Sequence, residues 1–117
     1  MKAWGFKYKT VAFTWVKTNK KSPSWFVGLG YYTRANPEIC ILGIRGKAPA
    51  KKSCSVRQLV VNPIGDHSTK PPCVRERIVE LFGDVPRIEL FARQKVEGWD
   101  SWGHGVTGDA PLCSLVE

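Results

Sequence analysis

Three short segments of the chain carry side chains whose types and spacing could do chemistry. The first, residues 33–38, holds Arg34, Asn36 and Glu38 at alternate positions ahead of an apolar run. Because alternate residues of an extended chain project to the same side, these three could present a guanidinium, an amide and a carboxylate together. That set suits a polar ligand such as a nucleobase and its phosphate. A plain turn, which Asn-Pro favours by itself, is the alternative.

The second segment is residues 67–71, His-Ser-Thr-Lys-Pro, in which Lys70 directly precedes a predicted helix. A cation is disfavoured at the N-terminal end of a helix, where the helix dipole is positive. A lysine that binds an anionic ligand would tolerate that cost, so Lys70 is a candidate anion-binding residue. The alternative is an ordinary polar loop that caps the helix.

The third segment is the apolar stretch 87–92, which contains Glu89. In open α/β sheets, ligands gather beyond the carboxyl ends of the strands. A carboxylate there could accept hydrogen bonds from ribose hydroxyls or bind a cationic ligand. The pattern slightly favours the alternative, an outward-facing Glu in an edge strand between Ile88 and Leu90.

The elements that must position these residues are four strands and a helix. β-Branched, aromatic and continuous apolar runs predict strands over residues 9–16, 38–45, 58–61 and 87–92. The helix begins at Pro71-Pro72 and ends at Gly83, because proline suits the first turn of a helix and glycine its C-terminal cap. Residues 93–117 are expected to wrap the surface.

These elements predict an α/β fold: a partial Rossmann-like sheet of about four strands with one main helix, incomplete on its N-terminal side. Strands such as 38–45 are typically buried on both faces, and one helix cannot cover both faces of a sheet. We therefore expect a partner chain, a second copy of the chain, or sequence absent from it to cover the rest.

The charge of the chain is divided unevenly. The net charge is +8, but residues 1–57 hold twelve Lys and Arg and one acid, whereas residues 58–117 hold six Lys and Arg and nine acids. A basic half with interleaved aromatic residues suits a polyanion, whose phosphates attract Lys and Arg. Nucleic acid is therefore the expected partner, with a merely solvated surface as the alternative.

The cysteines and the hydropathy exclude several other classes. The four cysteines, at positions 40, 54, 73 and 113, are widely and irregularly spaced, which predicts neither a disulfide framework nor a metal site. The chain has no run of eighteen apolar residues and no apolar signal core near its start. The expectation is a cytoplasmic chain without membrane association.

The order and spacing of the motifs resemble the adenine N(6)-methyltransferase family of the eukaryotic mRNA adenosine methylase and its phage and bacterial DNA relatives. The segments that carry this resemblance are GFKY at 5–8, FTWVKTN at 13–19, GYYTRANPE at 30–38, HSTKP at 67–71, RIELFAR at 87–93 and GWDSWG at 98–103. The resemblance implies methyl transfer from the sulfonium of S-adenosyl-L-methionine (SAM) to the exocyclic nitrogen of adenine.

The resemblance also implies roles for individual residues. Lys70 would pair with the carboxylate of the methionine moiety of SAM, while Glu89 and Arg93 would line the cofactor site, with Arg93 near the ribose. The residues of segment 33–38 singled out above would lie on the acceptor-base side. The chain would be one partial domain, with a basic acceptor-side half over 1–66, a cofactor-side core over 67–104 and a tail over 105–117.

Two departures from the family pattern bear on activity. The motif D-P-P-[FWY], which grips the adenine amine and stacks on the base, is absent, so no catalytic residue is identified. In the family this motif lies upstream, and the chain is therefore expected to begin partway through the domain, near the end of a helix at 1–4. His104 stands where relatives commonly have a ribose-binding Asn, and it can still form a hydrogen bond there.

The sequence thus supports one main hypothesis and two alternatives. The main hypothesis is part of a SAM-dependent adenine N(6)-methyltransferase acting on nucleic acid, DNA in preference to RNA, and inactive without a base-gripping partner. The first alternative is a non-catalytic methyltransferase-like module or partner subunit that binds nucleic acid. The second is a truncated phage or prophage fragment without an independent role.

Overall fold

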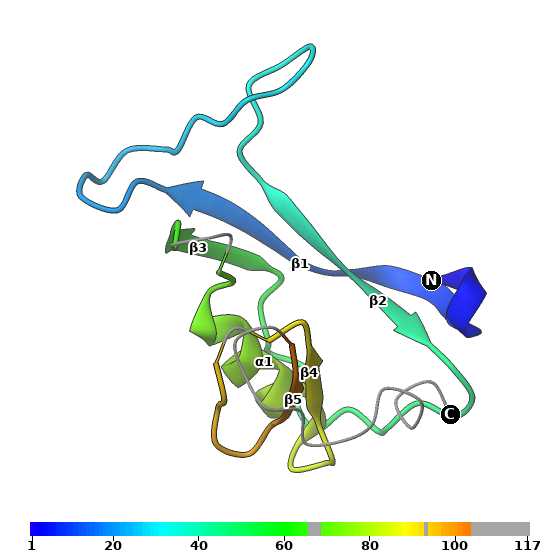
Figure 1. Cartoon of the computed structure of the whole chain (residues 1–117). Helices are drawn as coiled ribbons and strands as arrows, with labels where there is room; N and C mark the ends of the chain where they lie inside the picture. Colours follow the sequence, from blue (N-terminus) through cyan, green and yellow to red (C-terminus); the bar gives the residue numbers. More distant parts are fainter. Residues whose placement is uncertain (66–68, 93, 104–117) are drawn as a thin grey trace. The chain divides into compact units, whose positions relative to one another are not determined.

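The computed structural model describes residues 1–65, 69–92 and 94–103, and the chain divides into two units, Met1–Gly83 and Asp84–Glu117 (Figure 1). The predicted division at residues 66 and 67 is a functional one and stays a prediction. No described helix has the length and apolar character needed to cross a bilayer.

The first unit is organised by a twelve-residue strand, β1 (Lys7–Thr18). β1 is the central strand of a mixed sheet in the order β2-β1-β3, with β2 (Glu38–Ile44) antiparallel to it and β3 (Leu59–Pro63) parallel to it. The β-branched and aromatic residues of β1 fit such a pleated surface. A short 3-10 helix, η1 (Lys2–Trp4), precedes β1.

The helix of this unit, α1 (Pro72–Phe82), has the bounds that its proline and glycine predict. Pro71 is extended, with φ −60° and ψ 133°, and Pro72 opens the first turn, where the missing N–H of proline leaves no hydrogen bond unmade. Gly83 ends the helix with φ 78°, a left-handed angle that only glycine adopts easily, and its N–H donates to the carbonyl of Val79.

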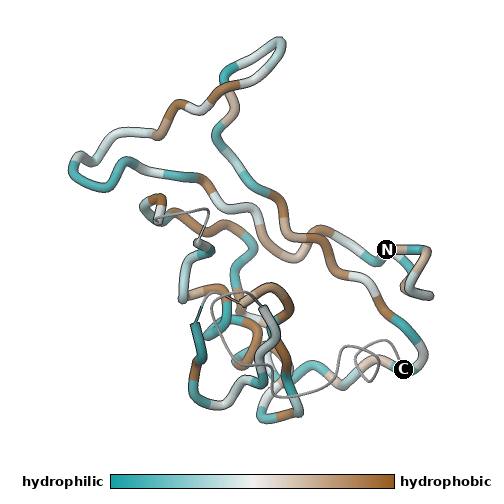
Figure 2. Tube along the Cα trace, viewed as in Figure 1, coloured by the Kyte–Doolittle hydropathy of each residue, from teal (hydrophilic) through white to brown (hydrophobic). Residues whose placement is uncertain are grey.

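The core of the unit lies between α1 and one face of the sheet. Phe13, Trp15 and Val60 are buried there, and partly buried side chains of α1, including Val74 and Ile78, pack against them. Figure 2 shows apolar residues in brown along β1, β2 and β3. Val74 and Ile78 therefore occupy the apolar helix face that the sequence predicts.

The opposite face of the sheet is not covered by α1. Ile41, Leu59 and Val61 are between 49% and 56% exposed, so the expectation that a partner chain, a second copy or further sequence buries this face stays a prediction. The reason for the exposure is geometric: α1 covers the face that carries Phe13 and Val60, and alternate residues of a strand point to the other side.

The second unit is built on two short parallel strands, β4 (Ile88–Leu90) and β5 (Asp100–Trp102). β4 is shorter than the predicted strand 87–92. β5 corrects the expectation that everything after Arg93 wraps the surface, because a three-residue strand is too short to give a readable sequence pattern. Residues 104–117 lie outside the described part of the chain.

The described residues form an α/β structure with a mixed sheet and one α-helix, as the sequence predicts at that level. β4 and β5 form a separate two-stranded sheet, and the three-stranded sheet of the first unit contains an antiparallel pair. The doubly wound order of a complete Rossmann-like sheet stays a prediction.

A core truncation tests the packing of the first unit. Phe13→Ala removes a ring that is 3% exposed, and the lost apolar burial together with the resulting cavity should lower the free energy of unfolding by about 3–5 kcal/mol. The measurement is guanidinium unfolding followed by tryptophan fluorescence. Leu29→Ala is the control, since Leu29 is 87% exposed and should shift stability by less than about 0.5 kcal/mol. Equal effects of the two substitutions would contradict the described core.

Candidate active site

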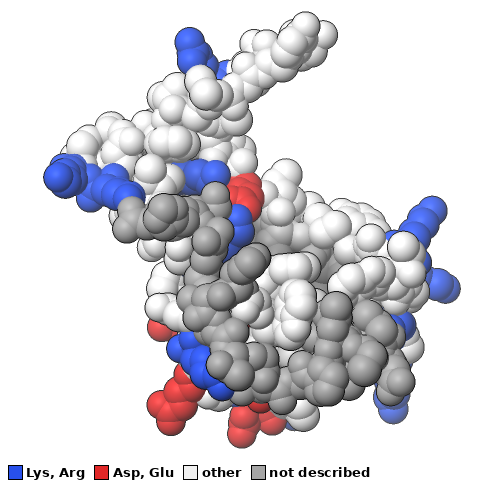
Figure 3. Space-filling model, viewed as in Figure 1, with Lys and Arg blue, Asp and Glu red and all other residues white. Residues whose placement is uncertain are grey.

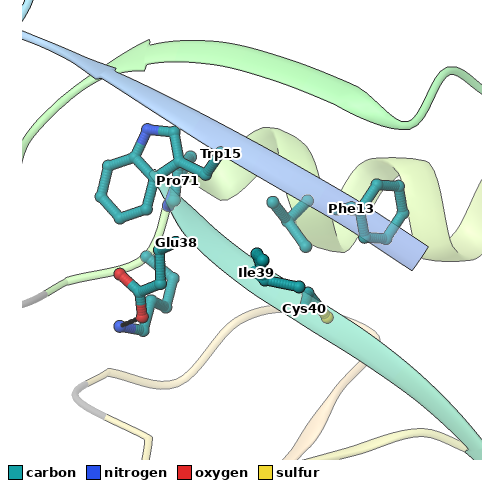
Figure 4. Close-up of a pocket in the computed structure, with 8 residues that line it drawn as sticks. Phe13, Trp15, Glu38, Ile39, Cys40 and Pro71 are labelled. Atoms are coloured by element: carbon teal, nitrogen blue, oxygen red, sulfur yellow. Dashed lines mark hydrogen bonds and ion pairs between the residues drawn. The ribbon is translucent and has the colours of Figure 1, made fainter. Parts of the chain in front are cut away.

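A cavity of about 240 Å³ lies in the first unit, between one face of the sheet and the start of α1. Figure 4 shows it from close by, with side chains from β1 and β2 around it. Its lining consists of aromatic and aliphatic walls with one carboxylate and one ammonium group; the residues are Phe13, Trp15, Glu38, Ile39, Cys40, Lys70, Pro71 and Val74.

The aromatic wall comes from β1. Phe13 and Trp15 are two residues apart in the strand, so both point to the face that α1 covers. The indole Nε1–H of Trp15 donates to the carbonyl oxygen of Asn62 in β3 at 2.9 Å. This bond satisfies the buried donor and fixes the orientation of the ring.

Glu38 is the acid of the cavity, and the register of the sheet places it. It is the first residue of β2 and pairs directly with Trp15 across the antiparallel ladder, so its side chain lies on the same face. Lys17, two residues beyond Trp15, also projects to that face. Its Nζ lies 3.4 Å from Glu38 Oε2 and 5.1 Å from the centre of the Trp15 ring.

Lys70 contacts Glu38 from the segment that precedes α1. Its ammonium donates a hydrogen bond to Glu38 Oε1, shown as a dashed line in Figure 4. Pro71 is buried and begins the turn into α1, and this anchors the backbone that carries Lys70. Glu38 is therefore clamped between two ammonium groups, of which Lys17 is 23% exposed and Lys70 is 53% exposed.

These contacts set the protonation of the site. Burial by itself opposes ionisation of Glu38, but the hydrogen bonds and charges of Lys70 and Lys17 outweigh it and hold the pKa of Glu38 below its ordinary value. Partial burial, assisted by the charge of Glu38, raises the pKa of the Cys40 thiol. At neutral pH the carboxyl group of Glu38 is therefore ionised, and the thiol of Cys40 is neutral.

Asn36 has a positioning role in the structure. Its Oδ1 accepts from the backbone N–H of Lys17 at 3.0 Å, and its Nδ2 donates to the carbonyls of Lys17, at 2.9 Å, and Phe26. The side chain continues the β1–β2 ladder one step beyond Glu38 and ties the ends of the intervening loop together. A role for Asn36 in holding the acceptor stays a prediction; both N–H groups of its amide are already used, and its Oδ1 has one further lone pair that could accept a hydrogen bond.

The other predicted site residues lie in different surroundings. Arg34 is exposed in the loop before β2. Glu89 is half-buried in β4, opposite Ser101 of β5, and belongs to the second unit. Arg93 and His104 lie outside the described residues. The predicted cofactor cradle of Lys70, Glu89 and Arg93 therefore stays a prediction, whereas Lys70 and Glu38, predicted on opposite sides of the reaction, lie in one cavity.

Sequence reasoning missed Lys17 and the two aromatic residues of β1 as site residues. Their spacing did hold a signal, because residues 13, 15 and 17 share one face of any strand that contains them. The sequence does not show which strand pairs with β1, and therefore does not show that Glu38 lies opposite Trp15.

A second cavity of about 180 Å³ borders the same carboxylate. Its lining includes Lys17, Phe26 and Thr69, together with Trp15 and Glu38, which also line the first cavity. Two cavities that share a fixed indole and a fixed carboxylate can hold two small ligand groups side by side. Such a site can align two reactants, with donors from lysine and acceptors from Glu38, and hold them against apolar walls.

Comparison with known proteins identifies the family of the chain. Residues 1–105 match the MT-A70 family, and the chain belongs to that family. This confirms the resemblance seen in the motifs. The chain is also similar to the Type II methyltransferase M.MunI of a Mycoplasma species, with 40% identity over 102 residues. That alignment covers 86% of this chain and 41% of M.MunI, so the chain spans about two fifths of the length of that relative.

The clamp on Glu38 predicts a particular pH dependence of stability. A lowered pKa in the folded chain means that the ionised carboxylate stabilises the fold above the ordinary Glu value of 4.5, and that this contribution is lost as the pH falls through the lowered value. Glu38→Gln should be less stable than the wild type at neutral pH, and the difference should close in acid. Urea unfolding from about pH 7 down to about pH 3 measures it.

The control for this measurement is Glu80→Gln, since Glu80 is exposed on α1. Its stability difference from the wild type should not change in the same way with pH. A Glu38→Gln difference that stays constant across the whole range would contradict the clamp.

Proposed function

We propose that this chain is part of a SAM-dependent adenine N(6)-methyltransferase that acts on nucleic acid, with DNA as the acceptor. The observation that carries the proposal is the Glu38 carboxylate held between Lys17 and Lys70 at the junction of two cavities. Membership of the MT-A70 family supports the reaction class, and the similarity to a Type II methyltransferase favours DNA over RNA.

The residues of the first cavity fit the methionine end of SAM, which when bound supplies the transferable methyl group. The side chain of Lys70 is 53% exposed, so solvent screens its ion pair with Glu38. Lys70 can therefore turn from Glu38 to a ligand carboxylate at a small cost in free energy. Phe13 and Val74 offer apolar walls for an aliphatic chain. The carboxylate of Glu38 can accept a hydrogen bond from an ammonium or amine group.

Lys17 gives the site a property that Lys70 alone would not. When Lys70 binds a ligand anion, Lys17 remains beside Glu38 Oε2 and keeps the carboxylate ionised. Glu38 then stays available as an acceptor for the amine of the acceptor base in the second cavity. The contribution of these residues is positioning, because methyl transfer requires the amine to approach in line with the departing sulfur.

The uncovered sheet face supports the further proposal that polypeptide outside these 117 residues completes the domain. The exposed apolar side chains Ile41 of β2 and Leu59 and Val61 of β3 lie on the outer strands of the sheet, outside the core that α1 covers. The sequence contains no D-P-P-[FWY] motif. We infer that a polypeptide carrying that motif covers this face and supplies the groups that hold the adenine.

Cofactor binding is tested with SAM and a matched pair of lysine variants. Calorimetric titration of the chain with SAM should give saturable binding that Lys70→Ala weakens by tenfold or more, since a charge-assisted hydrogen bond is worth about 1.5–3 kcal/mol. Lys47→Ala is the control, because Lys47 is exposed and lies outside both cavities at Glu38. Equal affinities for all three proteins would refute the role of Lys70.

The same preparations separate the proposed enzyme from a non-catalytic nucleic-acid-binding module. Methylation of adenine-containing DNA is expected only when a D-P-P-[FWY] polypeptide is added. Salt-sensitive DNA binding without any SAM binding would instead support the non-catalytic module. Robust turnover by these 117 residues alone would contradict the need for further polypeptide.

The sheet face makes a separate prediction about association. Alone, the chain should self-associate or bind a hydrophobic dye, because an exposed apolar sheet face is a site for association. Replacing Ile41 and Leu59 together by Thr keeps the strand preference and should reduce both effects. Sedimentation velocity and dye fluorescence measure them, and a wild-type chain that is a monodisperse monomer without dye binding would argue against a missing cover.

A further inference from the structure

Residues 19–37 join β1 to β2 as an arm that projects from the sheet (Figure 1); we call them the aromatic arm. The base of the arm is tied down. Thr18 and Trp25 form an antiparallel bridge, and the N–H of Asn19 donates to the carbonyl of Ser24 at 3.0 Å. The three hydrogen bonds of Asn36 close the base from the other side. The arm is therefore a built extension of the sheet.

The tip of the arm is a tight turn that requires glycine. The N–H of Gly28 donates to the carbonyl of Ala35 at 2.7 Å, which holds the two sides of the arm together. A Cβ on Gly30 would collide with the carbonyl oxygen of Thr33. Only glycine allows this close approach of backbone to backbone.

This turn presents two tyrosines to solvent. Tyr31 is 93% exposed and Tyr32 is 92% exposed, and their rings meet edge to face with centroids 4.8 Å apart. Leu29 and Val27 beside them are also exposed. Contiguous large apolar side chains are rarely held in water on a soluble protein unless that surface binds something.

The charge of the arm indicates what it binds. Between residues 19 and 37 the chain carries Lys20, Lys21 and Arg34 and no acid. The projecting part of the molecule at the top of Figure 3 accordingly shows Lys or Arg in blue and no red. Cations that flank solvent-facing aromatic rings are the pattern of a surface that contacts phosphates and stacks on bases.

The position of the arm links it to the candidate active site. It leaves β1 two residues after Lys17 and returns to β2 directly before Glu38, so both of its ends lie at the clamp. An enzyme that modifies a base within a duplex must take that base out of the stack, and the neighbouring bases then lose a stacking partner. Flat aromatic side chains close to the site can replace it.

On the basis of the function proposed above, we propose that Tyr31 and Tyr32 stack on unpaired or unstacked bases beside the acceptor adenine. The arm is then the part of the chain that recognises locally opened nucleic acid, and its own cations, Lys20, Lys21 and Arg34, contact the phosphates. Stacking of this kind tolerates any base, so the arm contributes affinity for an opened strand and no base sequence.

The experiment tests whether the flat rings of Tyr31 and Tyr32 are needed for binding, or whether any apolar side chain is sufficient. Fluorescence anisotropy measures binding of the 117-residue chain to a labelled duplex with one abasic position beside adenine, and to the same duplex fully paired. Replacing both tyrosines by Phe keeps the rings and should leave affinity within about twofold. Replacing both by Leu keeps an apolar tip without a flat ring and should weaken binding to the abasic duplex by tenfold or more.

Tyr8→Leu is the matched control, since Tyr8 is exposed on β1, away from the arm, and should leave affinity unchanged. The salt dependence of binding should be the same for the Leu variant and the wild type, because no phosphate contact is removed. Replacing Lys20 and Lys21 by Gln should reduce it.

Unchanged affinity of the double Leu variant, with a wild type that binds the duplex, would overturn the stacking proposal alone. The stacking proposal would also be overturned if the double Leu variant still bound DNA but no longer self-associated. The tip of the arm would then be an apolar contact between proteins. A wild-type chain with no affinity for any nucleic acid would remove the proposed function itself.

Discussion

The register between β1 and β2 is the constraint on which the rest of the site depends. It sets Glu38 opposite Trp15, and thereby puts the acid of the second strand on the face that already carries an indole and, two residues on, Lys17. A shift of one residue would turn Glu38 to the uncovered face of the sheet. The hydrogen bonds of Asn36 to the backbone of Lys17 hold the register at the point where the ladder ends.

This register also determines what each element contributes to the cavity. β1 supplies a rigid wall, because Trp15 is bonded to β3 and packed under α1. The turn into α1 supplies Lys70 on an exposed side chain that can exchange partners. Glu38 can therefore remain ionised while a ligand enters, because Lys17 stays beside it when Lys70 turns to the ligand. That combination distinguishes this cluster from a solvated surface ion pair, which contributes little to stability or binding.

Sequence patterns predicted the helix and strands whose formation depends on neighbouring residues in the chain. Pro71, Pro72 and Gly83 gave the bounds of α1, and the β-branched and apolar runs gave β1 to β3 within a few residues. The contact of Lys70 with Glu38 could not be found in that way, since it joins residues 32 apart through the tertiary fold. Asn36 illustrates the same limit: its type fitted a ligand contact, yet its partners are backbone groups of the neighbouring strand and loop.

The uncovered sheet face has a similar origin. An apolar run predicts that a strand is buried, but it does not identify the element that covers the strand. In this chain α1 buries the face with Phe13 and Val60, and the alternate residues Leu59 and Val61 stay in contact with solvent. The chain spans 41% of the length of M.MunI, and the proposal that further polypeptide covers this face accounts for the exposed residues without any change in the described fold.

The most direct test of the central claim is an NMR titration of the chain with SAM, followed at named side chains. The account predicts saturable shifts of the Trp15 indole N–H, of the Glu38 carboxylate and of the Lys70 ammonium, because these groups line the first cavity. Residues at the far end of α1, such as Phe82, should not shift. Saturable shifts elsewhere that leave Trp15, Glu38 and Lys70 unchanged would contradict it.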